Sequence, residues 1–117
     1  MTNQAVYDMS FAKVYPLLVN KAVRKGRTPA EVDAVITWLT GYTAEQIARA
    51  DADGTSYGDF FRNAPALHPN RDLIRGTICG VKIEAIQDPL MQEIRRLDKL
   101  VDELAKGRPL DKICRQR

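Results

Sequence analysis

The amino-acid sequence predicts an all-α protein, a small single-domain helical bundle with a long C-terminal helix. Apolar residues recur at helical spacing along most of the chain, and capping sequences precede three of these stretches. No stretch shows the sustained alternation of a half-buried strand, although one short strand near 77–83 is an alternative. A chain of 117 residues has the size of one domain. We place the helical domain at 1–107 and a basic C-terminal tail at 108–117.

The first expected helix lies in the segment FAKVYPLLVNKAVRKG. Its apolar stripe has the spacing i, i+4, i+8 and consists of Val14, Leu18 and Ala22, with Leu17 beside them. Pro16 cannot donate an interior hydrogen bond, so we expect the regular helix to begin just before it, with 11–14 as a lead-in. Gly26 is well placed to end the helix.

The second helix has a complete start signal in the sequence TPAE. Thr28 is expected to cap it, Pro29 to take the first helical position and Glu31 to complete a capping box. Gly41 ends the run. The apolar positions between follow the spacing i, i+3, i+4, i+7 and are Val32, Val35, Ile36 and Leu39.

A second capping box follows at once, in the sequence TAEQ. Thr43 would cap and Gln46 would reach back, which predicts a third helix over about 44–50. A short helix over 57–63 is expected next, closed by Pro65. The region 70–87 is ambiguous, because its β-branched residues favour a strand and its apolar spacing also fits a helix. We expect short helical turns there.

The last helix has the clearest pattern. Asp88 caps it, Pro89 takes the first position, and the helical pattern runs to Gly107. Its apolar residues form a heptad seam that consists of Leu90, Ile94, Leu97, Val101 and Leu104. Such a seam must dock on something. A second copy of the chain is one candidate, and the protein's own core is the other, because Met91 and Leu100 widen the stripe.

The formal charge of +3 is unevenly placed. One basic cluster spans 21–27 and another spans 106–117, and both could attract a nucleic acid. We expect solvated surfaces instead. No stretch is long and apolar enough for a membrane span, and Cys79 and Cys114 lack metal-binding spacing. The expected protein is cytoplasmic and reduced, without a membrane partner, a metal or another cofactor.

The segment ITWLTGYTAEQIA, from Ile36 to Ala48, could be a helix-turn-helix for DNA. Its second helix would carry Gln46 and Arg49 into the groove, but acidic residues follow closely and would oppose phosphates. The interpretation we favour is a core helix corner. Its aromatic and aliphatic residues would then be buried, namely Trp38, Tyr42 and Ile47.

The chain offers few groups for catalysis. A Cys79–His68 pair is conceivable, but we expect Cys79 to be a small buried residue and His68 to hydrogen-bond to the backbone. No catalytic residue is therefore assigned. One stretch, HPNRDLIRG, gathers hydrogen-bond donors that could hold a small anion, namely His68, Asn70, Arg71 and Arg75. The alternative is that Asn70 caps a turn and the arginines pair with Asp72 or Glu84.

Three long blocks of the sequence resemble a bacterial family known as domain of unknown function 2200. These blocks are VYPLLVNKAVRKGRT, EVDAVITWLTGYT and the segment from Ala64 to Gly107. Members usually have Asn where this chain has His68, which argues against a catalytic imidazole, and often Tyr where it has Arg96. The resemblance implies a bacterial cytoplasmic setting and no assigned activity. We therefore expect a non-enzymatic protein-interaction module, with self-association through the seam as one form of it.

Overall fold

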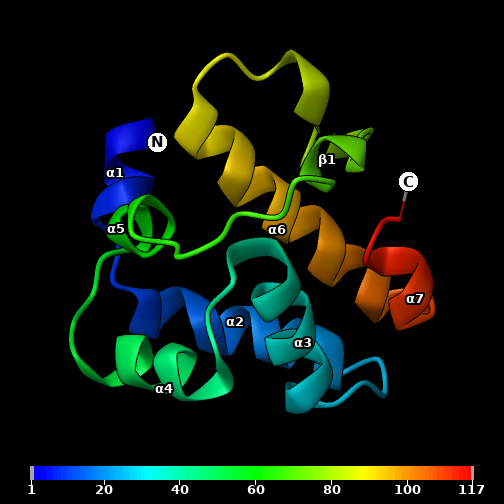
Figure 1. Ribbon diagram of the computed structural model, residues 1–117, viewed down its shortest axis with the longest axis horizontal. Coiled ribbons are helices and arrows are strands. Elements are labelled where there is room, and N and C mark those ends of the chain that lie inside the picture. Colours follow the sequence, from blue (N-terminus) through cyan, green and yellow to red (C-terminus); the bar gives the residue numbers. More distant parts are fainter. Residues whose placement is uncertain (1, 117) are drawn as a thin grey trace.

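The computed structural model describes residues 2–116 and confirms a predominantly helical fold (Figure 1). The long helix α6 crosses the molecule, and α2 and α3 pack against it, while the shorter helices lie around this centre. The α-helices are α1 (Asn3–Asp8), α2 (Phe11–Val23), α3 (Pro29–Thr40), α4 (Ala44–Ala52), α5 (Tyr57–Arg62), α6 (Pro89–Ala105) and α7 (Leu110–Ile113). No helix within residues 2–116 has the length and apolar character needed to cross a membrane.

All three helix starts expected from capping sequences are confirmed. Thr28 and Thr43 each accept a hydrogen bond from the third residue of their helix, whose side chain bonds back to the cap. Asp88 accepts from the N–H of Leu90 at 3.0 Å. These starts are local features, because the cap and its partners lie within four residues of sequence.

The beginning of α2 differs from the prediction. The helix starts at Phe11 and continues through Pro16, so 11–14 is helix and not a lead-in. Tertiary contacts hold this first turn: the Phe11 N–H donates to the Thr55 carbonyl at 2.8 Å, and the buried Phe11 ring stacks on Phe60 at 4.1 Å between centroids. Long-range packing therefore outweighs the missing proline hydrogen bond.

The region 70–87 contains both of the structures that its sequence allows. Short 3₁₀ turns, η1 (Arg71–Leu73) and η2 (Ile83–Ala85), flank an antiparallel hairpin of β1 (Thr77–Ile78) and β2 (Val81–Lys82). Helical turns alone were the wrong expectation, and the strand alternative is confirmed. Cys79 and Gly80 form the two-residue loop with φ values of 53° and 75°, as a type I′ turn requires. Cys79 is exposed there, so the expectation of a buried cysteine is wrong.

The heptad seam of α6 is inside the single chain. Leu97, Val101 and Leu104 have no exposed surface, Ile94 is 2% exposed, and Leu90 packs half-buried against the same core. The α6 seam faces α2 and α3 of its own chain. This corrects the expectation of self-association through Leu90–Leu104, because a second copy has no access to side chains that are already covered.

Residues 108–116 also differ from the expected tail. They include α7, whose Ile113 is fully buried, and α7 packs against α6 and α3. Beyond α7, the Arg115 guanidinium binds both carboxylate oxygens of Glu103. One apolar anchor and one two-pronged ion pair therefore fold this segment onto the body of the protein.

Gly41 should tolerate alanine poorly. Its φ is +81°, and an added Cβ would lie 2.8 Å from both the Cβ and the backbone N of Ala66. We expect Gly41→Ala to lower the free energy of unfolding by about 2–3 kcal/mol, combining left-handed strain with displacement of the loop. Gly54→Ala is the matched control, because its φ is +80° and nothing lies within 4 Å of the new Cβ. Equal losses in urea titrations of the two variants would contradict this close approach.

Candidate functional site

The loop that carries the expected anion-binding residues is fixed to the end of α3. The Ala66 N–H donates to the Thr40 carbonyl and the His68 N–H to the Leu39 carbonyl, each at 3.0 Å. Carbonyls at a helix C-terminus lack partners within the helix, so this loop satisfies two of them. The position of the loop is therefore set by main-chain bonds before any side chain is considered.

His68 contributes to structure in two ways. Its ring stacks on Trp38 with centroids 4.2 Å apart and planes at 18°. Its Nδ1 accepts the N–H of Asn70 at 3.0 Å, which confirms the expected bond to the backbone. Trp38 is accordingly half-buried beneath this loop, not enclosed in the core as predicted. One ring nitrogen is occupied and one ring face is covered, so the imidazole is held as a packing group.

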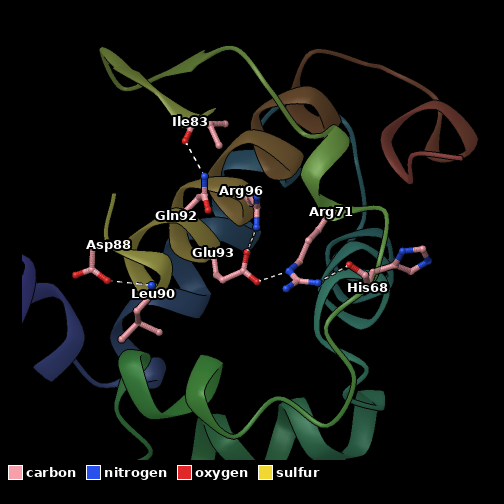
Figure 2. Close-up of polar contacts among 8 residues, drawn as sticks. All are labelled: His68, Arg71, Ile83, Asp88, Leu90, Gln92, Glu93 and Arg96. Atoms are coloured by element: carbon pink, nitrogen blue, oxygen red, sulfur yellow. Dashed lines mark hydrogen bonds and ion pairs between the residues drawn. The ribbon is translucent and has the colours of Figure 1, made fainter. Parts of the chain in front are cut away.

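Arg71 points inward, toward α6 (Figure 2). Its Nε donates to Glu93 at 2.7 Å and one terminal nitrogen donates to the His68 carbonyl at 2.9 Å. Glu93 is 7% exposed and also binds Arg96 from the next turn of α6. One buried carboxylate thus holds two guanidinium groups and ties η1 to α6.

The other two expected residues point elsewhere. The side-chain amide of Asn70 donates to the Arg115 carbonyl at 3.2 Å, which connects the loop to the C-terminal segment. Arg75 is exposed, and its Nε donates to the Asp72 carbonyl at 3.3 Å. Glu84 accepts a hydrogen bond from the N–H of Gly76 at 3.0 Å, and this bond, together with the nearby charge of Arg75, helps to hold the pKa of Glu84 below its usual range. The four residues of this loop do not converge on one ligand.

Acidic residues of α6 hold much of the basic charge that the sequence displays. Glu103 binds Arg108 as well as Arg115, and Asp102 binds both Lys21 and Lys106. Sequence reasoning missed Glu93 and Glu103 as anchors. Helical spacing gives no signal for this pair, because ten positions separate two side chains by about 80° around the helix axis. Their partners Arg71 and Arg115 lie outside α6, so only the fold brings each pair together. The basic clusters are therefore weaker attractors of polyanions than their residue counts imply.

Burial or hydrogen bonding shifts the pKa of several groups on α6 or beside it. It raises the pKa of Asp98, although the neighbouring Arg95 partly offsets the effect. Burial also raises the pKa of the Cys114 thiol, which disfavours the nucleophilic thiolate. A hydrogen bond from the Tyr7 hydroxyl, at 2.5 Å, helps to hold the pKa of the Asp88 carboxyl below its usual range. Asp88 therefore remains charged as the cap of α6.

The outward side of α2 is different, since its cations lack acidic partners. Lys13 and Arg24 make no ion pair with any of residues 2–116. Leu17 is 61% exposed and Val23 is 45% exposed, and no other large hydrophobic side chain in the described chain is as open. We define the α2 face by six exposed residues of the helix and its C-cap, which are Lys13, Pro16, Leu17, Asn20, Val23 and Arg24.

These features define the chain as a small, predominantly helical single-domain protein whose polar loop is bound into its own structure. The chain belongs to the family DUF2200, because the sequence model of that family matches residues 5–115. The family is described as 'uncharacterized protein conserved in bacteria'. The chain is similar to the uncharacterized protein SP1917, whose crystal structure is known, with 51% sequence identity. The match covers 96% of this chain and 92% of that one, and the two structures superpose with a TM-score of 0.92. No curated protein matches the sequence.

Proposed function

We propose that the protein is a non-enzymatic interaction module that binds an acidic partner protein through the α2 face. The observation that carries this proposal is the exposure of Leu17 and Val23 beside Lys13 and Arg24. Exposed apolar groups gain free energy when a partner covers them, at about 25 cal/mol for each Å² removed from water. Contiguous apolar patches with a polar rim mark interaction surfaces, and the apolar members of this face are Pro16, Leu17 and Val23.

The charge of the α2 face indicates what the partner must offer. Lys13 lies near the start of the helix and Arg24 at its end, with Leu17 between them. A partner with an apolar centre and carboxylates on either side would match both features. Complementary charge of this kind mainly raises the association rate and the specificity.

A second copy of the chain fits the α2 face poorly. In a two-fold pair of antiparallel α2 helices, Lys13 of one copy would face Arg24 of the other, and a parallel pair would set each cation against itself. Like charges at these positions oppose association. We therefore expect a monomer in light scattering at micromolar concentrations.

A nucleic acid is a weaker fit than a protein. Phosphate binding draws on several free cations, and the ion pairs of α6 already hold Lys21, Arg108 and Arg115. The α2 face keeps only two cations around exposed aliphatic side chains. Such a surface contributes little counterion release but offers apolar area to a protein.

Site-specific photo-crosslinking tests the proposal in the bacterium that encodes the protein. A photoreactive amino acid replaces Leu17 in one variant and Glu45, exposed on α4, in a control. We expect a crosslinked protein from position 17 only, and its loss when Lys13→Glu and Arg24→Glu are added. Equal crosslinking from both positions, no adduct, or an adduct to nucleic acid would overturn the proposal.

Binding of the crosslinked partner can then be measured with purified proteins. Leu17→Asp should weaken binding at least tenfold, equivalent to about 1.4 kcal/mol, because it places a charge in the apolar centre. The melting temperature should stay nearly the same, since Leu17 is exposed in the free protein. A loss of binding that only follows a loss of folded protein would count against the α2 face.

A further inference from the structure

A hollow of about 200 Å³ lies between α4 and α5 and uses no residue of the α2 face. It is lined by Gln46 and Arg49, the two polar side chains that would enter the DNA groove if the segment 36–48 were a helix-turn-helix. Both are exposed, but they border a concave surface and not a convex ridge. Residues lining the hollow include Tyr42, Gln46, Arg49, Ala50, Asp53 and Asn63.

Several polar groups in the hollow have unused bonding capacity. The side chains of Arg49 and Asn63 make no hydrogen bond or ion pair with residues 2–116. Gln46 uses its side-chain oxygen to accept the Thr43 N–H at 2.9 Å, so its NH₂ group remains available. Three sets of donors therefore border one small space.

The hollow also carries opposite charges that stay apart. Arg49 and Asp53 are one helical turn apart, yet they form no ion pair. One oxygen of Asp53 accepts both the N–H and the hydroxyl of Thr55, which orients the carboxylate and leaves its second oxygen open. The hydrogen bonds from Thr55, and more weakly Arg49, hold the pKa of Asp53 below its usual range, so it is ionised at neutral pH.

The floor of the hollow is apolar and fixed. The Tyr42 hydroxyl donates to the Phe60 carbonyl at 2.7 Å, and the Tyr42 ring packs on the Phe60 ring at 4.5 Å between centroids. Ala50 adds a methyl group that is mostly buried. A ligand could therefore rest an apolar substituent on a surface that is already ordered, which lowers the entropic cost of binding.

We infer that this hollow binds a small zwitterion with an apolar substituent, of the α-amino acid class. The carboxylate would lie against Arg49 and the amides of Gln46 and Asn63, because guanidinium groups bind carboxylates in a two-pronged geometry. The ammonium group would bind the open oxygen of Asp53, and the substituent would cover Tyr42. A simple anion would be attracted by Arg49 but repelled by Asp53, and a simple cation would meet the reverse, so only a zwitterion matches both charges.

The size of the hollow agrees with this class of ligand. Sites for drug-sized molecules occupy roughly 300–1,000 Å³. A hollow of about 200 Å³ suits a smaller molecule, such as a single amino acid with an aliphatic or aromatic side chain. Because the space is open on one side, we expect a dissociation constant on the order of 1 mM.

Amide chemical shifts of the ¹⁵N-labelled protein test the inference. L-leucine and L-phenylalanine are the probes, and N-acetyl-L-leucine and L-leucinamide lack the ammonium group and the carboxylate respectively. We expect saturable shifts at residues 46–53 and at Asn63 with the free amino acids, and at least tenfold weaker binding of both blocked forms. Equal binding of the blocked forms, or no saturable shift at these residues, would overturn the inference.

Two variants on α4 provide the matched comparison. Arg49→Ala should weaken L-leucine binding at least tenfold, and Glu45→Ala, exposed on the same helix but not lining the hollow, should leave it unchanged. Both residues are exposed, so neither variant should lose its fold. Retained binding in Arg49→Ala, or an equal loss in Glu45→Ala, would contradict the assignment.

Discussion

Replacing Leu97 with alanine should lower the free energy of unfolding by about 3 kcal/mol, within the range of about 2–5 kcal/mol typical of buried leucines. Leu97 is fully buried near the middle of α6, where α2 and α3 of the same chain cover that helix. The loss combines reduced apolar burial with a cavity that rigid neighbours cannot fill completely. Urea denaturation measures the change in the free energy of unfolding. The urea concentration at the unfolding midpoint should be the same at two protein concentrations, because the protein folds without associating.

Leu17→Ala is the matched control for this prediction. The chemical change is the same, but Leu17 is 61% exposed in the free protein, so the expected change in stability is within about 0.5 kcal/mol. A midpoint that rises with protein concentration would show that folding is coupled to association. If Leu97→Ala also had only a small effect on stability, the two results together would indicate that the α6 seam is a contact between two copies and not the core of one chain.

Glu93→Ala should lower the free energy of unfolding by about 3 kcal/mol, because it leaves two guanidinium groups without their carboxylate. Arg96 carries most of this penalty, since its side chain is only 12% exposed. Arg71 has 32% of its side chain exposed and can recover part of the loss by contact with water. Thermal and urea denaturation measure the effect, and Glu45→Ala is the surface control.

Arg71→Ala should cost less than Glu93→Ala, about 1 kcal/mol, because Glu93 keeps Arg96 as a partner. This order also bears on the idea of an anion site in the 68–75 loop. If Arg71→Ala left stability unchanged while inorganic phosphate stabilised the unmodified protein, Arg71 would be a ligand-binding group and not a structural one. We expect the opposite result on both counts.

Helix starts could be predicted from sequence because their determinants are local. Thr28 and Thr43 each make a capping box with a residue three positions later, and Asp88 precedes a proline. The end of α3 at Gly41 is equally local, since its φ of +81° suits glycine. These features depend on neighbours along the chain, so no knowledge of the rest of the fold is needed.

Other elements depend on distant contacts and were missed. The start of α2 is held by Thr55 and Phe60, far along the sequence. The helix α1 was not expected at all, and it docks through Tyr7 onto Asp88. The hairpin uses a Cys-Gly turn, where Asn-Gly or Asp-Gly would have been a clear signal.

The candidate site shows the same division. Sequence reasoning placed His68 and Arg71 among the candidate anion-binding residues but could not identify their partners, because Trp38 and Glu93 lie far from them along the chain. Leu17 was grouped with the apolar stripe of α2, although the structure exposes it. A helical period indicates which residues share a face, but only packing determines which face is covered.

Calorimetric titration of the partner protein that crosslinks to position 17 tests most directly whether the α2 face is the binding surface. We predict that the double variant Lys13→Glu with Arg24→Glu binds this partner at least tenfold more weakly than the unmodified protein. Added salt should weaken binding of the unmodified protein, because it screens the charges of Lys13 and Arg24. Glu45→Ala should leave the affinity unchanged. Unchanged affinity in the charge-reversed variant would show that the partner binds elsewhere and would contradict the α2 face as the binding surface.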